Sequence, residues 1–74
     1  MTKVPSISGK AAVKALVKIG YTIARQKGSH IRLLHAERKP LTVPNHKVLG
    51  KGLLRKLLRD AWLSVDDFID LLKN

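Results

Sequence analysis

The 74-residue sequence has no cysteine, only five acidic residues and no long apolar run. Without cysteine the chain forms neither a disulfide framework nor a thiolate zinc site, and a cytoplasmic setting is the default expectation. Residues 1–10 lack the apolar centre of a signal peptide, and no apolar segment approaches the roughly 18 residues of a membrane span. We therefore expect one small domain over residues 1–74, off the membrane and with a core too thin for a large cofactor.

The scarcity of acids leaves a strong excess of positive charge. The sequence has 15 Lys and Arg residues and a formal net charge of +10. Residues 1–59 carry 14 of these cations and a single acid, Glu37, whereas the other four acids lie within residues 60–74. Hydrophobic residues make up 45% of the chain, which is typical of a folded protein. Because a folded polycation attracts phosphate polymers, nucleic acid is the expected partner.

Apolar residues spaced by three and four predict two amphipathic helices, over Gly9–Ile19 and Gly50–Ala61. Ser8 is placed to cap the first helix and Gly20 to end it. Ser64 directly follows a leucine and precedes an aspartate by three residues. This pattern predicts that a short third helix starts at Ser64.

Each long helix carries a cation at every fourth position, which forms a basic ridge along one side. The ridges are Lys10, Lys14 and Lys18 on the first helix, and Lys51, Arg55 and Arg59 on the second. For the first ridge, an ordinary solvated helix face is an equally good interpretation.

Between the two long helices the period changes to two. The segments Tyr21–Gln26, His30–His35 and Leu41–Val43 predict an antiparallel meander, with Lys27–Ser29 as a hairpin turn. Pro40 and Pro44 bound the third segment, because neither proline fits inside a central strand.

Both long helices are expected on one face of this sheet, because so short a chain covers only one face. Ile31 and Leu33 then point to the core, and alternation places Ile23 and Arg25 on the same face as Tyr21. The open face is predicted to have His30 near its centre. Its expected members are Thr22, Ala24, Gln26, His30, Arg32, Leu34 and Thr42.

Few residues offer catalytic chemistry. The sequence has no Gly-rich phosphate loop, nucleophile elbow or helical histidine pair. His30 and His35 face opposite sides of a regular strand, so we expect no metal centre and no cofactor. Histidine transfers protons near neutral pH and RNA supplies its own nucleophile, so His30 is a candidate base, beside Lys27 and Arg32 as charge-stabilising groups. On the residues alone, a surface histidine without a role is the simpler interpretation.

Three motifs favour a catalytic role for His30 over no role. Residues 25–30 read RQKGSH, residues 43–47 read VPNHK and residues 51–59 read KGLLRKLLR. In this order and spacing they resemble the HicA family of toxin mRNA interferases, and the likeness extends from Ser8 to Ser64. The resemblance implies an α+β fold like that of double-stranded-RNA-binding domains. It also implies an endoribonuclease that cleaves mRNA, is neutralised by a cognate HicB antitoxin and has its catalytic histidine at His30.

The expected RNA-contacting residues combine the ridges with the residues around the hairpin turn and the following loop. They are Lys10, Lys14, Lys18, Lys27, Gly28, Ser29, Arg32, Lys47, Lys51 and Arg55. Trp62 stands where the resembled family usually has glycine at the end of the second helix. We expect its indole to cover the thin core rather than to contact a partner.

Two other functional classes fit parts of the sequence. A noncatalytic double-stranded-RNA-binding module shares the fold and the charge, and differs in tolerating His30→Ala without loss of function. A helix-turn-helix DNA regulator fits less well, because the second long helix offers mainly Lys, Arg and Leu, which suit phosphates better than base edges.

Overall fold

The computed structural model describes residues 3–73 and has the predicted order of elements. The elements are α1 (Gly9–Val17), β1 (Thr22–Lys27), β2 (His30–Leu34), β3 (Leu41–Pro44), α2 (Lys51–Asp60) and α3 (Val65–Lys73). The short third helix is present as predicted, with nine residues, the same length as α1.

The predicted helix signals are confirmed where they can be measured. The Ser8 hydroxyl accepts a hydrogen bond from the Ala11 N–H at 3.1 Å and so caps α1. The Ser64 hydroxyl accepts one from the Asp67 N–H at 3.0 Å and caps α3. Gly20 has a φ of 106°, the left-handed region in which glycine commonly ends a helix.

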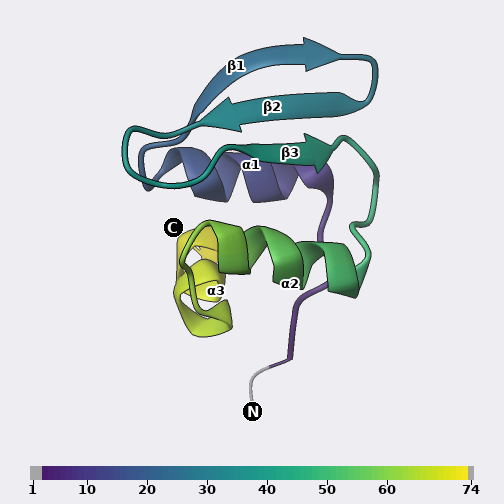
Figure 1. Cartoon of the computed structure of the whole chain (residues 1–74). Helices are drawn as coiled ribbons and strands as arrows, with labels where there is room; N and C mark the ends of the chain where they lie inside the picture. Colours follow the sequence, from purple (N-terminus) through teal and green to yellow (C-terminus); the bar gives the residue numbers. More distant parts are fainter. Residues whose placement is uncertain (1–2, 74) are drawn as a thin grey trace.

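The three strands form an antiparallel sheet in the order β1-β2-β3, with all helices on one side (Figure 1). α1 and α2 both pack under β3, and α3 packs against both of them. Ile31 and Leu33 are 4% and 0% exposed on the helix side, as predicted, and their partners Val43 and Leu41 are buried with them. The core therefore lies under β2 and β3.

β1 departs from the predicted alternation. A bulge between Ile23 and Arg25 shifts the register, so Arg25 pairs with Arg32 and Gln26 pairs with Ile31. Directly paired residues project from the same face of an antiparallel sheet. Arg25 is therefore on the open face and Gln26 on the helix side, the reverse of the prediction for both, because a bulge inserts one residue into the period of two.

The end of α2 corrects a second expectation. Trp62 has a φ of 59° and is 66% exposed, so its indole does not cover the core. Its N–H donates to the Arg59 carbonyl and the Leu63 N–H donates to the Leu58 carbonyl, which are the two bonds of a Schellman motif. The left-handed backbone directs the indole to solvent, while buried Ala61 and half-buried Leu63 supply the apolar packing.

The layering of one three-stranded antiparallel sheet on helices is compatible with the fold of double-stranded-RNA-binding domains. Within residues 3–73, no helix has both the length and the apolar character needed to cross a membrane.

Candidate nucleic-acid interface

Three chain segments meet at the end of the sheet where β2 begins, on the right of Figure 1. The Asn45 N–H donates to the Ser29 carbonyl, which ties the loop after β3 to the hairpin turn. The Gly9 N–H donates to the His46 carbonyl at 2.9 Å, which ties the start of α1 to the same loop. A Cβ on Gly9 would lie 2.1 Å from the Pro44 carbonyl oxygen, so only glycine permits this close approach.

Four lysines surround this junction, and all are exposed. Lys10 lies in the first turn of α1, Lys27 ends β1, Lys47 follows β3 and Lys51 begins α2. Both α1 and α2 begin at this end, so the positive ends of two helix dipoles add to the lysine charges. The junction therefore concentrates positive potential at the turn that carries Gly28 and Ser29.

His30 is the first residue of β2 and is exposed at this junction. It pairs with Lys27 of β1 on one side and with Pro44 of β3 on the other. The imidazole is therefore on the open face, as predicted, but at the end of the central strand rather than near the centre of the face. The centre is occupied by Arg32, whose guanidinium donates to the Thr42 hydroxyl at 3.0 Å.

The corrected open face is more basic than the sequence predicted. Arg25 and Arg32 are direct cross-strand neighbours, and Lys27 lies opposite His30. Like charges placed directly opposite each other repel, so this arrangement costs stability unless an anion lies between them. The face is suited to binding phosphate groups.

The two predicted basic ridges divide between the two ends of the molecule. Lys10 and Lys51 lie at the junction, and Lys14 and Arg55 are exposed farther along their helices. Lys18 lies at the opposite end of α1, where its ammonium group donates to the Leu71 carbonyl at 2.7 Å in the last turn of α3. The structure thus does not bring Lys18 to the junction.

The other two histidines have different surroundings. His35 is half-buried, its Nε2 lies 2.8 Å from the Ile19 carbonyl, and its Nδ1 accepts from the Glu37 N–H at 2.9 Å. Both ring nitrogens are thus engaged by backbone groups, so His35 has a structural role. His46 is exposed and borders a depression of ≈ 280 Å³. Among residues 3–73 no group of three or more His, Asp or Glu side chains is placed to hold a metal ion.

Sequence reasoning missed the position of two amides. Gln26 and Asn45 line a cleft between α1 and the sheet, on the helix side of β1. The bulge that turns Gln26 to this side has no signal in the sequence pattern. Asn45 lies beside a predicted strand end, and only the bond from its N–H to Ser29 shows that it belongs to the junction.

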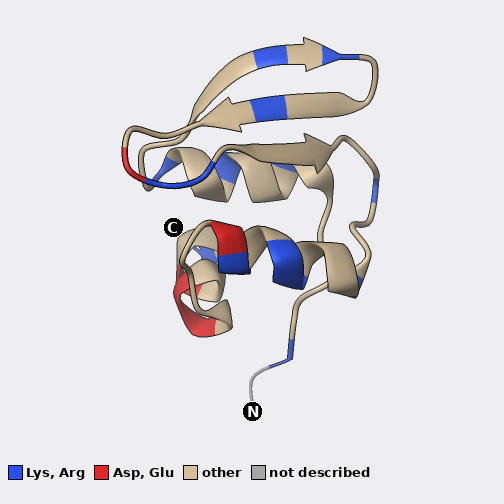
Figure 2. Cartoon of the chain, viewed as in Figure 1, with Lys and Arg blue, Asp and Glu red and all other residues tan. Residues whose placement is uncertain are grey.

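Charge is distributed unevenly over the fold, as Figure 2 shows. Blue bands mark cations on the sheet, on α1 and along α2, whereas the acids other than Glu37, which lies in the loop between β2 and β3, gather at the end of α2 and on α3. The acidic segment therefore lies away from the junction around His30.

Comparison with known proteins identifies the family. A family model described as the HicA toxin of bacterial toxin-antitoxin systems matches residues 9–63 of the 74-residue chain. The chain belongs to the HicA toxin family. A HicA toxin is the toxin component of a toxin-antitoxin pair, and the matched region spans α1 through α2, including the whole junction. No curated protein matches the chain significantly.

Proposed function

We propose that this HicA-family chain is a cytoplasmic endoribonuclease that cleaves mRNA, with His30 as the acid–base residue and no metal or cofactor. The observation that carries the proposal is the exposed imidazole of His30 at the meeting point of the cationic turn, loop and helix starts. Family membership supports the toxin role of such a site.

The chemistry requires one base and a source of positive charge. His30 removes the proton of a ribose 2′-hydroxyl, and the 2′-oxygen attacks the adjacent phosphorus. The bond from phosphorus to the 5′-oxygen breaks, which leaves a 2′,3′-cyclic phosphate and a 5′-hydroxyl. Lys27 and Arg32, on the same face as His30, stabilise the added negative charge on the phosphorane-like transition state. The leaving 5′-oxygen takes a proton, for which His46 and Lys27 are the candidates at this end.

The decisive experiment compares purified wild-type protein with His30→Ala on a defined mRNA, with circular dichroism to show that both are folded. His30 is exposed, so the substitution leaves the fold intact and lowers the cleavage rate by about a hundredfold to ten-thousandfold. His46→Ala, made at another exposed histidine of the junction, shows whether the second imidazole supplies the acid. Wild-type products bearing a 5′-phosphate contradict the mechanism, because water would then be the nucleophile.

A noncatalytic RNA-binding module is the second candidate, favoured by the fold and by the exposed lysines and arginines of α1 and α2. Such a module binds RNA by its shape and phosphates. It predicts equal affinity of wild type and His30→Ala for RNA, with no cleavage by either. Growth arrest and loss of RNA after induction of the wild type alone would exclude it.

The partner in this proposal is an antitoxin of the HicB type. Because the junction and the open face carry the exposed cations, we expect the antitoxin to cover them with acidic groups. Addition of the antitoxin should therefore block RNA binding and cleavage together.

A further inference from the structure

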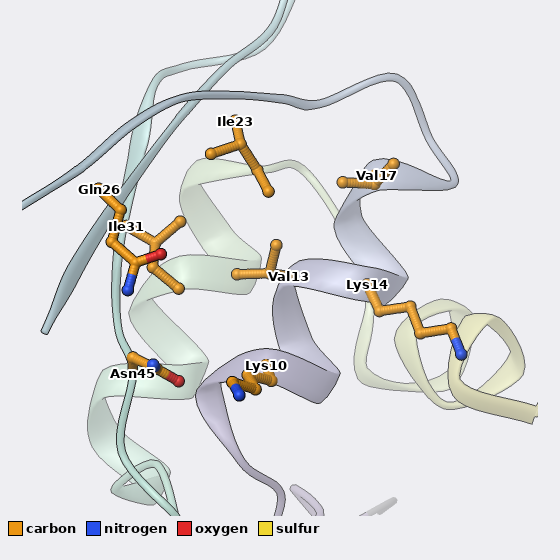
Figure 3. Close-up of a pocket in the computed structure, with 8 residues that line it drawn as sticks. All are labelled: Lys10, Val13, Lys14, Val17, Ile23, Gln26, Ile31 and Asn45. Atoms are coloured by element: carbon orange, nitrogen blue, oxygen red, sulfur yellow. The ribbon is translucent and has the colours of Figure 1, made fainter.

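A cleft of ≈ 520 Å³ separates β1 from α1 on the helix side of the sheet (Figure 3). Its lining consists of Lys10, Val13, Lys14, Val17, Ile23, Gln26, Ile31 and Asn45. Most ligand sites in proteins are clefts of about 300–1,000 Å³ with apolar walls and a few placed polar groups. The cleft fits this description and is separate from the open face that carries His30.

The bulge in β1 leaves the walls of the cleft apart. Every residue of β1 is exposed, and neither α1 nor α2 packs closely beneath this strand. Ile23 and Val17 face the cleft from opposite walls and remain 55% and 45% exposed (Figure 3). A 74-residue protein has little apolar surface to spare. Two branched side chains that face each other across the cleft offer apolar contacts to a ligand.

The polar groups of the cleft are two carboxamides and two ammonium groups. Gln26 and Asn45 lie at one side of the cleft in Figure 3, Lys10 lies on α1 near Asn45, and the Lys14 side chain projects from α1 toward α3. A carboxamide offers both a donor and an acceptor, which is the combination that pairs with the edge of a nucleobase. Aliphatic walls suit the flat faces of a base, and lysines suit the phosphates that flank it.

The cleft is continuous with the junction around His30. Asn45 reaches from the cleft to the hairpin turn, because its N–H donates to the Ser29 carbonyl. Ile31, which forms part of the floor, follows His30 in β2 but faces the helix side, so the cleft and the imidazole lie on opposite faces at the same end of the sheet. Lys10 borders both the cleft and the depression beside His46. A strand of RNA at the junction is thus adjacent to the cleft.

We propose that this cleft binds one unpaired nucleobase of the RNA substrate and thereby sets the preference for the cleavage site. The inference rests on the proposed ribonuclease function and adds a specificity subsite to it. Gln26 and Asn45 read the base edge, Val17 and Ile23 hold its faces, and Lys10 with the junction lysines holds the flanking phosphates. A protein segment in the same cleft would use the apolar walls but would not need two carboxamides.

The binding test uses methyl-labelled His30→Ala protein and the four ribonucleoside 5′-monophosphates as probes. We expect the NMR signals of the Val13, Val17 and Ile23 methyl groups to shift, with one or two bases shifting them more than the others. Ile23→Trp, which places an indole in the cleft at an exposed strand position, should abolish the shifts of the remaining Val13 and Val17 methyl groups. Unshifted methyl groups with all four nucleotides, or shifts only on addition of the antitoxin, would overturn the proposal.

The cleavage test maps the 5′ ends produced from a transcript that contains all short sequence contexts. Gln26→Ala should change the relative rates at preferred and other sites by about tenfold, because one base-edge contact is lost. Thr22→Ala, on the same strand but outside the cleft, is the matched control and should keep the wild-type pattern. Cleavage by Gln26→Ala with an unchanged pattern overturns the subsite and leaves the ribonuclease function standing. A wild type that cleaves nothing, together with base-selective methyl shifts, overturns the ribonuclease function and supports the subsite as a binding feature.

Discussion

Gly20 and Trp62 occupy the same kind of position, the left-handed residue that ends a helix by a Schellman motif. Their φ angles are 106° and 59°. At Gly20 a Cβ would lie 2.9 Å from the Nε2 atom of His35, so the packing as well as the backbone requires glycine. At Trp62 the side chain extends into solvent and meets no such barrier, but a residue with a Cβ in this conformation still costs stability.

Replacing Trp62 with glycine should therefore stabilise the protein. We expect Trp62→Gly to raise the free energy of unfolding by about 1 kcal/mol, because relief of the left-handed backbone exceeds the added chain entropy of glycine. Urea unfolding followed by far-UV circular dichroism measures the change without a tryptophan signal. Trp62→Ala removes the indole but keeps a Cβ, so it should show no gain. A loss of stability in both variants would mean that the indole contributes a packing contact.

Ionisation of Tyr21 makes the stability of the protein depend on pH in the alkaline range. It is 1% exposed, its hydroxyl donates to the Lys39 carbonyl at 2.8 Å, and burial raises its pKa above the ordinary value of 10.0. The folded state thus holds the phenolic proton to a higher pH than the unfolded chain does. Its stabilising contribution is complete below about pH 10 and declines as the pH rises from there through the folded-state pKa.

Tyr21→Phe should remove this decline. At pH 7 the variant loses the bond to Lys39 and about 1 kcal/mol of stability. Because phenylalanine does not ionise, the difference from wild type should shrink as the pH is raised from 9 to 11. Urea unfolding at each pH measures both proteins. Stability curves that stay parallel over this range would show that Tyr21 does not ionise with a raised pKa.

At the scale of elements, the hairpin turn, the loop after β3 and the start of α1 form one unit. The bonds from Asn45 to Ser29 and from Gly9 to His46 hold these segments together. The Pro44 carbonyl lies where a Cβ of residue 9 would be, so the start of α1 sits directly on the loop backbone. The positions of Lys10 and His30 therefore depend on one close backbone contact.

A single methyl group on Gly9 should disrupt this unit. Gly9→Ala places its Cβ 2.1 Å from the Pro44 oxygen, and the backbone must move apart at a cost of about 2 kcal/mol or more. Gly52→Ala is the matched control, because it lies within α2 with nothing within 4 Å and should stabilise the helix by about 0.5–1 kcal/mol. Thermal unfolding of the wild type, Gly9→Ala and Gly52→Ala measures the expected loss and the expected gain of stability. Equal effects of the two substitutions would contradict the close contact.

At the scale of the whole molecule, the charge distribution governs RNA binding. The cations lie over the sheet, α1 and α2, while four of the five acids lie between residues 60 and 74. Binding to RNA releases counterions from each neutralised phosphate, so affinity falls with salt concentration. The number of lysines that face phosphates can be counted from the slope of this dependence.

Substitutions of Lys51 and Lys18 should change the salt dependence of RNA binding by different amounts. In a His30→Ala background, Lys51→Gln should weaken binding to single-stranded RNA and reduce the slope of log affinity against log salt by about 0.7–1. Lys18→Gln should leave the slope nearly unchanged, because its ammonium group is bonded to Leu71 at the other end of α1. Fluorescence anisotropy between about 50 and 200 mM salt measures both. Equal reductions of the slope in the two variants would show that bound RNA reaches the far end of α1.

Most of the fold could be predicted from the sequence, because its signals are local. Apolar spacing and the caps at Ser8 and Ser64 locate the helices, and alternation places Ile31 and Leu33 in the core. The motifs around His30 identify the family that the family model also matches. Each of these signals lies within a few residues of the feature that it predicts.

Only the folded structure decided the remaining features, because they depend on strand pairing and on backbone conformations that a periodic pattern does not specify. The register of β1 against β2 contains the bulge, which turned Gln26 toward the cleft and Arg25 toward the open face. Lys18 lies at the far end of α1, where the packing of α3 bonds its ammonium group to the Leu71 carbonyl. The left-handed backbone of the Schellman motif directs Trp62 to solvent. A periodic pattern does not record the inserted residue of β1, because the pairing of β1 with β2 sets it, or the left-handed residue Trp62, because the bonds that end α2 set it.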